Sequence, residues 1–363
     1  PVDDEGLKYW LALARLRGLD RLGVRGLLQR FSSPREIFES PDSIDSFSSV
    51  LAKGVREFDG WDWVEDQLSA MEKNGARAIT FNDPGFPPLL RHIQDPPAML
   101  FAKGRAFDEQ TPPVAIVGTR HPSQYGLKMA TMLGRDLASK GLCVVSGMAR
   151  GCDMAGHKGA LSAEGFTVAV LGTGVDLAYP PESKRLYEEI SENGLLLSEF
   201  PMSTPPVKHN FPARNRIIAG ISLGVVVIEA PLRSGSLMTA RLALEYGRDV
   251  MAVPGQALTD KCAGTNRLIK DGACLIDNAD DVVQALSLEK VPSRQIEKVE
   301  RPSEALAGDE RLLWHALAVE PVHIDHLIEE TGLGVMRASA LLLEMEFKGL
   351  VRQFPGKCFA KGV

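Results

Sequence analysis

The chain has 363 residues, enough for two or three domains, and its 44% hydrophobic and 24% charged content is typical of a globular protein. No apolar run approaches the length of a membrane-spanning helix, and a formal net charge of −6 argues against binding polyanions over the whole surface. The five cysteines show no CxxC spacing, so we expect reduced thiols in a cytoplasmic protein, with Cys143 and Cys274 in the core. A local basic groove is still compatible with this charge, because salt screens distant acids.

Residues 1–60 predict a small helical domain. Apolar residues recur at helical spacing and are interrupted by Gly18 and Gly23, and five arginines but one acid, Asp20, lie in the segment 15–30. This pattern is similar to a degenerate helix-hairpin-helix, a module that contacts the DNA backbone, but it lacks the tight Gly-x-Gly loop. A protein-docking or packing domain is at least as good an interpretation.

Residues 61–288 predict an α/β domain with a doubly wound, mostly parallel sheet of the extended Rossmann-like type. Continuous apolar strands alternate with helices, which is typical of a parallel sheet covered on both faces. The expected strands are 114–118, 142–146, 167–172, 195–199, 224–229, 249–253 and 274–276, with short additional strands within 76–81 and 99–104. Ligands of such folds bind beyond the carboxyl ends of the strands.

Small residues and arginines follow the first two of these strands and predict a rim that accepts phosphates. The predicted rim residues are Gly118, Thr119, Arg120, Ser146, Gly147, Ala149, Arg150 and Gly151. A nicotinamide or flavin fingerprint fails, because Gly172-Thr173-Gly174 lacks the third glycine and Tyr179-Pro180-Pro181 stands where a helix should run. We therefore expect no cofactor.

The segment 200–228 carries cations and an aromatic residue without any acid, among them Lys208 and Arg214. We expect a helix that begins at Pro212, which leaves Phe211 on the preceding loop. Cations around an exposed aromatic ring suit single-stranded nucleic acid, because phosphates take the charge and a base takes the ring face.

Ser234-Gly235-Ser236 follow the strand 224–229, and we expect Ser236 to cap a helix that begins near Leu237. The unpaired N–H groups of such a helix start accept an anion. Each half of the segment 205–239 alone is better interpreted as ordinary structure, a charged helix face or a strand–loop–helix connection, and only their combination favours nucleic acid.

Asp153 and His157 are four residues apart at the start of a predicted helix and share one face of it. They could be an acid–base pair, but a structural hydrogen bond with a helix cap is the favoured interpretation. No other catalytic arrangement and no metal-ligand spacing is convincing.

Residues 289–305 are charged, contain two prolines and predict a linker. Residues 306–363 predict a winged-helix domain, with helices in 310–319, 323–332 and 335–349 and a two-stranded wing in 351–362. Nine acids outnumber six Lys and Arg residues over 304–363. We therefore expect this domain to contact protein rather than duplex DNA.

Seven segments of the central domain together resemble the DNA-processing protein A family (DprA/Smf) of bacterial natural transformation. They are VAIVGTR (114–120), VVSGMARGCDMAGHKGAL (144–161), AVLGTGVDLAYP (169–180), LLSEFP (196–201), FPARNRIIAGIS (211–222), VIEAPLRSGSLMTARLALEYGR (227–248) and AVPG (252–255). The three-domain layout also fits this family. One departure is Cys152, where the family usually has an aliphatic residue.

The resemblance implies a core that binds single-stranded DNA without a cofactor, a metal ion or a catalytic residue, and that forms a homodimer. It also implies that the protein loads RecA onto incoming single strands and helps to overcome single-strand-binding protein. By motif, Arg120, Lys208, Phe211 and the loop 146–151 should line the DNA pocket. Further contributors are expected at Arg214, Asn215, Ser234, Gly235 and Ser236.

Two other functions have to be weighed. A nucleotide N-glycosidase of the LOG/lysine-decarboxylase-like type would use a PGGxGT loop and a glutamate, but the comparable loop, 234–239, lacks the double glycine and Glu245 is distant from it in sequence. A winged-helix transcription factor is disfavoured by the acidic residues of 306–363.

Overall fold

The computed structural model describes residues 4–16, 19–45, 48–288, 306, 308–318 and 321–361, without the side chains of 4–5 and 19–22. The chain divides into two compact units, 1–294 and 295–363. The helical segment 1–60 therefore belongs to the same compact unit as the α/β core. The linker predicted at 289–305 lies outside the described residues.

The first unit is built on a nine-stranded sheet with the order β1-β2-β6-β5-β4-β3-β7-β8-β9. All pairings from β6 through β9 in this order are parallel, whereas β1 pairs with β2 and β2 with β6 in antiparallel orientation. The strands are β1 (Arg77–Thr80), β2 (Met99–Gly104), β3 (Pro113–Val117), β4 (Cys143–Ser146), β5 (Thr167–Val170), β6 (Leu195–Ser198), β7 (Gly224–Val227), β8 (Asp249–Ala252) and β9 (Cys274–Leu275). This confirms the predicted fold class.

Strand order places a topological switch point beside β3. The chain adds β4, β5 and β6 on one side of β3, and then returns to add β7, β8 and β9 on the other side. The connection that leaves β3 therefore runs toward β4, and the connection that leaves the neighbouring β7 runs the opposite way, toward β8. A crevice at such a point is where doubly wound sheets bind ligands.

Nearly every strand residue is apolar, and helices cover both faces of the sheet and bury these side chains. One face packs against α9 (Asn210–Ile221) and α10 (Gly235–Glu245), and the other against α6 (Gln124–Ser139), α7 (Cys152–Ser162) and α12 (Ala279–Ala285). The remaining helices of the core are α8 (Lys184–Asn193) and α11 (Ala263–Lys270), with 3-10 turns at Pro88–His92, Pro181–Ser183 and Asp260–Cys262.

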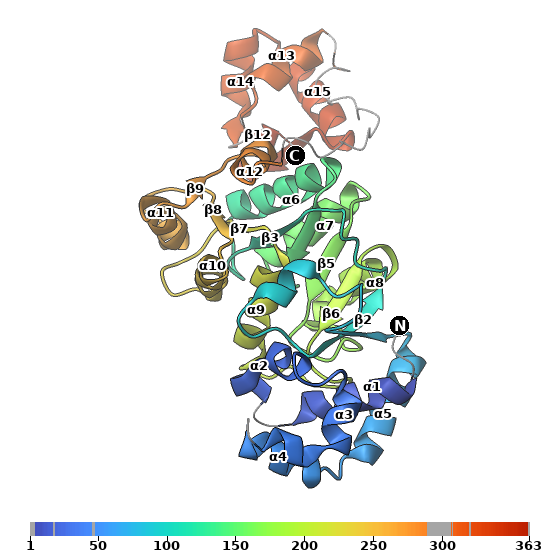
Figure 1. Ribbon diagram of the computed structural model, residues 1–363. Helices are drawn as coiled ribbons and strands as arrows, with labels where there is room; N and C mark the ends of the chain where they lie inside the picture. The colour runs from blue at the N-terminus through green and yellow to red at the C-terminus, as the bar shows by residue number, and fades with distance from the viewer. Residues whose placement is uncertain are drawn as a thin grey trace. The chain divides into compact units, whose positions relative to one another are not determined.

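The N-terminal helices gather beside the end of the sheet that carries β2 and β6 (Figure 1). They are α1 (Asp4–Arg15), α2 (Leu19–Leu28), α3 (Pro34–Glu39), α4 (Ser49–Arg56) and α5 (Trp61–Asn74), with a 3-10 turn at Pro41–Ile44. Two of their arginines stabilise the unit itself. Arg25 donates to the carbonyl oxygen of Ile93 (3.3 Å), and the Arg15 guanidinium lies 4.6 Å from the ring centre of Trp63.

Asp153 and His157 each make a structural hydrogen bond, as the sequence favours, but the predicted helix cap was wrong, because Gly151 stands at the N-cap of α7 and Asp153 lies in the first turn. Asp153 is buried and accepts a hydrogen bond from the backbone N–H of Ala149 (3.2 Å). His157 Nδ1 lies 2.7 Å from the Thr167 hydroxyl, which donates to the carbonyl of Val144 (2.7 Å). The imidazole is therefore the donor to Thr167, and burial holds it neutral by lowering its pKa to about 3.

The second unit has the winged-helix fold. Its helices are α13 (Asp309–Ala316), α14 (Ile324–Thr331) and α15 (Val335–Phe347), and its wing is formed by β11 (Val351–Phe354) and β12 (Cys358–Lys361). A third strand, β10 (Val322–His323), pairs with β12 and was not predicted, because two residues carry no readable alternation. Leu313, Leu327, Leu342 and Met345 are fully buried in its core.

All five cysteines are free thiols. Cys143 is buried as predicted, but the prediction for Cys274 was wrong: it is exposed, because β9 is a two-residue strand at the edge of the sheet. None of the helices described in the structure is long and apolar enough to cross a bilayer. Within the same residues, no group of His, Cys, Asp and Glu side chains has the arrangement of a metal site.

Candidate nucleic-acid interface

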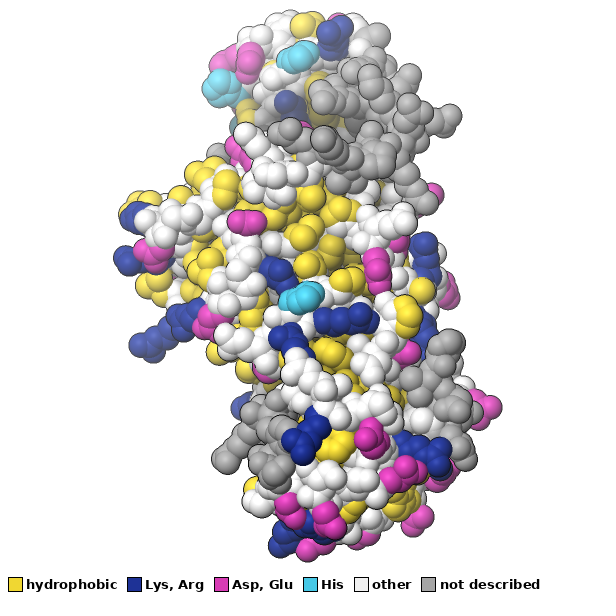
Figure 2. Space-filling model, viewed as in Figure 1, with side chains coloured by type: hydrophobic (Ala, Val, Ile, Leu, Met, Phe, Trp, Pro, Cys, Tyr) yellow, Lys and Arg dark blue, Asp and Glu magenta, His cyan; other side chains and the backbone are white. Residues whose placement is uncertain are grey.

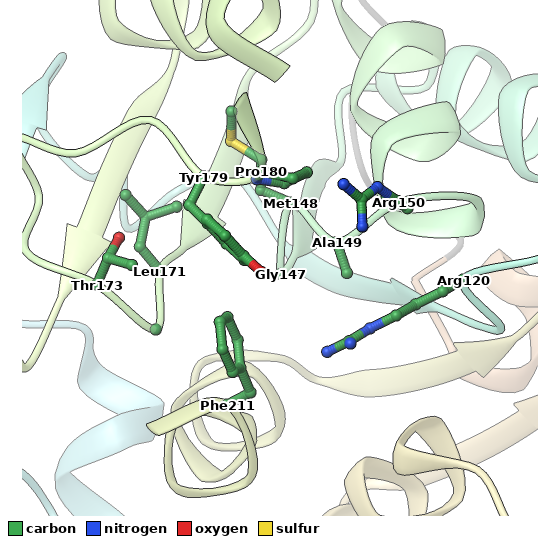
Figure 3. A pocket seen from close by; sticks show the side chains of 11 residues that line it. Arg120, Gly147, Met148, Ala149, Arg150, Leu171, Thr173, Tyr179, Pro180 and Phe211 are labelled. Atoms are coloured by element: carbon green, nitrogen blue, oxygen red, sulfur yellow. The ribbon is translucent and has the colours of Figure 1, made fainter. Parts of the chain in front are cut away.

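A solvent-open pocket lies beyond the carboxyl ends of β3, β4 and β5 (Figure 3). Five of its lining residues come from the predicted set: Arg120, Gly147, Ala149, Arg150 and Phe211. The others are Met148, Leu171, Gly172, Thr173, Tyr179 and Pro180. Parallel strands bring these loops together although they are distant in sequence.

Phe211 occupies the first turn of α9 rather than the preceding loop, because the helix starts two residues earlier than predicted. The helix starts at Asn210 because the Asn210 side chain is itself buried and donates to the carbonyl of Gly172 (3.1 Å). Pro212 is tolerated there, since the first N–H groups of a helix have no intrahelical partner. Phe211 is thereby held rigidly at the pocket.

The Phe211 ring is the centre of a cation–aromatic cluster. The Arg120 guanidinium carbon lies 5.6 Å from the Phe211 ring centre, and the Tyr179 ring centre lies 5.6 Å away at an interplanar angle of 37°. Figure 3 shows both side chains pointing toward Phe211 from different sides of the pocket. A Cβ atom on Gly172 would approach Phe211 Cδ1 to 2.8 Å, so glycine is required beneath the ring.

Arg214 is a scaffold residue and not a surface contact as the sequence suggested. Its side chain is 3% exposed and donates to the carbonyls of Gly147 (2.6 Å) and Val170, which joins the ends of β4 and β5. Burial lowers its pKa to about 10, an effect that Asp153 opposes. The guanidinium fills the space where any side chain on residue 147 would lie, so Gly147 is also fixed by packing.

Arg150 is exposed at the pocket and forms an ion pair with Glu182, a residue of the turn that precedes α8. About half of each side chain is exposed, 51% for Arg150 and 48% for Glu182. The hydrogen bond to Glu182 raises the pKa of Arg150. Sequence reasoning gave no sign of this partner, which is 32 residues away.

The remaining rim residues differ in access. Lys208 is exposed on the segment that enters α9, but it is not part of the pocket lining. Gly118 and Thr119 are half-buried, and Gly151 starts α7 with a φ of 80°. Ser146 is buried and donates to the carbonyl of Ile116 (2.6 Å), so its side chain does not reach a ligand.

The Ser234–Ser236 loop lies beside the pocket rather than in it. The predicted cap was wrong: α10 begins at Gly235, and Ser234 caps it by accepting from the Ser236 N–H (3.3 Å). Asn215, one turn after Phe211 on α9, donates to the carbonyl of Gly235 (3.4 Å). The loop and the pocket therefore lie along the same helix.

Tyr179 is the most informative residue that the sequence analysis missed. An aromatic residue shortly after β5 is a readable signal of a ring that could stack on a base. The sequence analysis used Tyr179 only as an argument against a dinucleotide-binding helix.

Basic side chains gather in the middle of the face shown in Figure 2. With Arg120 beside the Phe211 and Tyr179 rings, the pocket is a local basic, aromatic surface despite the net charge of −6. Such a surface fits a flexible polyanion that has stacking groups.

Two family models match the chain. The model described as DNA recombination-mediator protein A matches residues 77–287, and the DprA winged helix domain matches residues 297–357. Protein Smf of Synechocystis is 33% identical over 385 residues, covering 96% of this chain and 97% of that protein. DNA processing protein DprA of Streptococcus pneumoniae is 45% identical over 220 residues, covering 61% of this chain and 78% of that protein.

Solved structures agree. DNA processing protein A from S. pneumoniae superposes with a TM-score of 0.67 at 35% identity, covering 76% of this chain and 95% of that one. DNA processing protein A from Helicobacter pylori, a structure concerned with that protein's single-stranded DNA binding mode, gives 0.52 at 32% identity and covers 58% and 96%. With a family model over more than half of its length and a relative aligned over nearly all of it, the chain belongs to the DNA recombination-mediator protein A family.

Proposed function

We propose that the protein binds single-stranded DNA in the pocket between Arg120, Tyr179 and Phe211, without a cofactor and without catalysing a reaction on it. The observation that carries this proposal is the rigid Phe211 ring, set between a cation and a second aromatic at the carboxyl edge of the sheet. The H. pylori relative, whose structure addresses single-stranded DNA binding, supports the same chemistry here.

Each part of the site has a distinct task in this proposal. Phe211 and Tyr179 offer ring faces to bases, while Arg120, Arg150 and Lys208 neutralise phosphates. Gly147 makes room for the buried Arg214 guanidinium, which holds the loop after β4 at the pocket. Stacking and phosphate contacts carry little base information, so the binding should tolerate any sequence.

The family resemblance supports the wider role. We propose that the protein protects incoming single strands and loads RecA onto them during natural transformation or recombination, acting in the cytoplasm. A homodimer through the Rossmann-like core and displacement of single-strand-binding protein belong to the same proposal.

A nucleotide N-glycosidase is not favoured by the geometry. Gly235 starts α10 and the exposed Glu245 ends it, so the loop and its candidate acid are about 15 Å apart along the helix. Absence of ribose 5-phosphate release from nucleoside monophosphates is the expected result of the direct assay.

Arg120→Ala and Lys208→Ala are expected to weaken single-stranded DNA binding by similar factors on all sequences. Each lost phosphate contact should also flatten the slope of log affinity against log salt by about 0.7. Fluorescence anisotropy across a salt series measures both quantities. Lys270→Ala, at the exposed end of α11, is the control for loss of one positive charge; an equal effect in that control would place the DNA elsewhere.

Glu182→Gln is expected to tighten single-stranded DNA binding about two- to fivefold at low salt. Its carboxylate competes with phosphate for Arg150, and because the ion pair is solvent-exposed it is weak, so the gain in affinity is modest. Glu192→Gln makes the same charge change at an exposed position near the end of α8. If Glu182→Gln weakened binding while Glu192→Gln did not, Glu182 would be orienting Arg150 rather than competing for it.

A further inference from the structure

Glu229 is a buried carboxylate to which the DNA-binding proposal gives no task. It lies two residues beyond the end of β7, at the carboxyl edge of the sheet, and is 1% exposed. Its hydrogen-bond partners in the described part of the chain are all uncharged: the backbone N–H and hydroxyl of Ser123 and the thiol of Cys262. A carboxylate without a neighbouring cation is costly to bury. Such a costly residue beside a binding site is a candidate for a role in that site.

Glu229 fastens the loop that leads from β3 into α6 at two points. Its backbone carbonyl accepts a hydrogen bond from the Thr119 N–H (2.7 Å). Its side chain accepts from the Ser123 N–H (2.8 Å) and from the Ser123 hydroxyl. Arg120, which lines the pocket, lies between these two points. The contacts therefore fix the backbone on both sides of Arg120 to the end of β7.

The helices on either side of this loop hold it as well. Ser123 caps α6 by accepting from the Gly126 N–H (3.1 Å). A Cβ atom on Gly126 would come within 2.5 Å of Glu229 Oε2, so the first turn of α6 packs directly against the carboxylate. The Cys152 N–H donates to the Thr119 carbonyl (3.3 Å), which joins the loop to α7. The loop is thus anchored to α6 and α7 in addition to β7.

Arg120 depends on this backbone for its position. Among the residues that the structure describes, no Asp or Glu side chain pairs with Arg120, whereas Arg150 is held by Glu182. The Arg120 guanidinium carbon lies 5.6 Å from the Phe211 ring centre, and Figure 3 shows the side chain extending from its loop toward that ring. A shift of the loop would therefore move the cation away from the ring.

We propose that Glu229 is a positioning residue of the pocket, which holds the loop 119–123 so that Arg120 meets a DNA phosphate beside the Phe211 ring. This inference rests on the single-stranded DNA site proposed above. Glu229 does not touch the DNA, because its side chain is buried. It acts by reducing the conformational freedom that the Arg120 loop would otherwise lose on binding.

A double-mutant cycle tests this proposal, with affinity for a labelled single strand measured across a salt series. Glu229→Gln keeps the size of the side chain and can accept from the Ser123 N–H, but its amide NH2 cannot accept from the Ser123 hydroxyl. It is expected to weaken binding about three- to tenfold and to flatten the salt dependence, as Arg120→Ala does. In the Arg120→Ala background the same change should alter affinity by less than about twofold. In the Lys208→Ala background its full effect should remain, because Lys208 lies on another segment.

The pattern across these backgrounds separates positioning from a general loss of stability, which would weaken binding by the same factor in all three. Glu199→Gln is the matched control, because it removes a half-buried carboxylate that follows β6 and pairs with Arg216. It should leave the affinity and the salt slope of the folded protein unchanged. Ser123→Ala removes only the hydroxyl contact and should give a smaller loss of the same kind. If Glu229→Gln does not fold, the cycle is run with Ser123→Ala.

Hydrogen exchange adds a readout at the loop itself, where the backbone amides of 119–126 should exchange faster in folded Glu229→Gln than in the wild type. An equal effect of Glu229→Gln in the wild-type and Arg120→Ala backgrounds would overturn the proposal, because Glu229 would then not act through Arg120. Wild-type affinity of the folded variant would overturn it too. Unchanged binding by Arg120→Ala itself would reject the proposed DNA site, and this inference with it.

Discussion

Replacing Phe211 by alanine is expected to weaken single-stranded DNA binding by about 5- to 150-fold. This range corresponds to the ~1–3 kcal/mol that a base stacked on an aromatic side chain contributes. The ring is half-buried between Arg120, Tyr179 and the Gly172 backbone, so its orientation is set before DNA arrives. Little ordering entropy is then lost on binding, which favours a large effect.

Two further variants at this position separate stacking from packing. Phe211→Tyr keeps a ring face and should retain most of the affinity, whereas Phe211→Leu keeps apolar volume and should bind nearly as weakly as alanine. Thermal unfolding of all three shows whether the fold is intact. Binding by Phe211→Ala equal to wild type, in a folded protein, would remove Phe211 from the interface.

Replacing Arg214 by methionine is expected to lower the free energy of unfolding by about 3–5 kcal/mol, the usual cost of removing one partner from a buried charged network. The change leaves the carbonyls of Gly147 and Val170 without their guanidinium donor and Asp153 without its neighbouring cation. The midpoint of urea unfolding measures the loss.

Arg214→Lys preserves the charge but not the planar guanidinium that donates to both carbonyl oxygens. An intermediate loss of unfolding free energy is therefore expected. Arg233→Met, at an exposed position before α10, is the control and should change stability by less than about 0.5 kcal/mol. Combining Arg214→Met with Asp153→Asn should cost less than the sum of the single changes, because the two groups share one network. A loss below about 1 kcal/mol for Arg214→Met would contradict the scaffold role.

The sheet could be predicted because its signal is local. Runs such as 224–229 are continuous, apolar and bounded by turn residues, and a strand of this kind is fixed by its own composition. Because parallel strands end at the same edge of the sheet, the residues that follow them were expected together. These are Arg120, Gly147, Arg150 and Phe211. The sequence predicted β1 and β2 as short strands, but it carried no signal for their antiparallel pairing.

The details of the site depended on tertiary contacts. Arg214 and Lys208 are alike in sequence as cations near Phe211, but only the packing of β4 and β5 against α9 decides that Arg214 is buried. Helix α9 starts at Asn210, before the predicted start at Pro212, because the buried Asn210 side chain donates to the Gly172 carbonyl. Tyr179 lines the pocket and Glu182 pairs with Arg150 from the segment between β5 and α8, for which periodicity gives no prediction.

In the winged-helix domain, counting charges favoured a protein partner, which stays a prediction. The count did not separate the acids that pair with Arg337 and Lys348 from Glu344, nor did it show that Met336 and Phe347 are exposed. An amphipathic pattern with apolar residues on two sides was not distinguishable from an entirely buried helix by sequence alone.

The most direct test of single-stranded DNA binding at this pocket compares labelled single- and double-stranded oligonucleotides, across a salt series, on the wild type and on Lys208→Ala/Phe211→Ala. We predict a strong preference of the wild type for the single strand and a loss of both affinity and salt slope in the folded double variant. Equal affinity for both DNA forms, or an unchanged single-strand affinity in the variant, would contradict it.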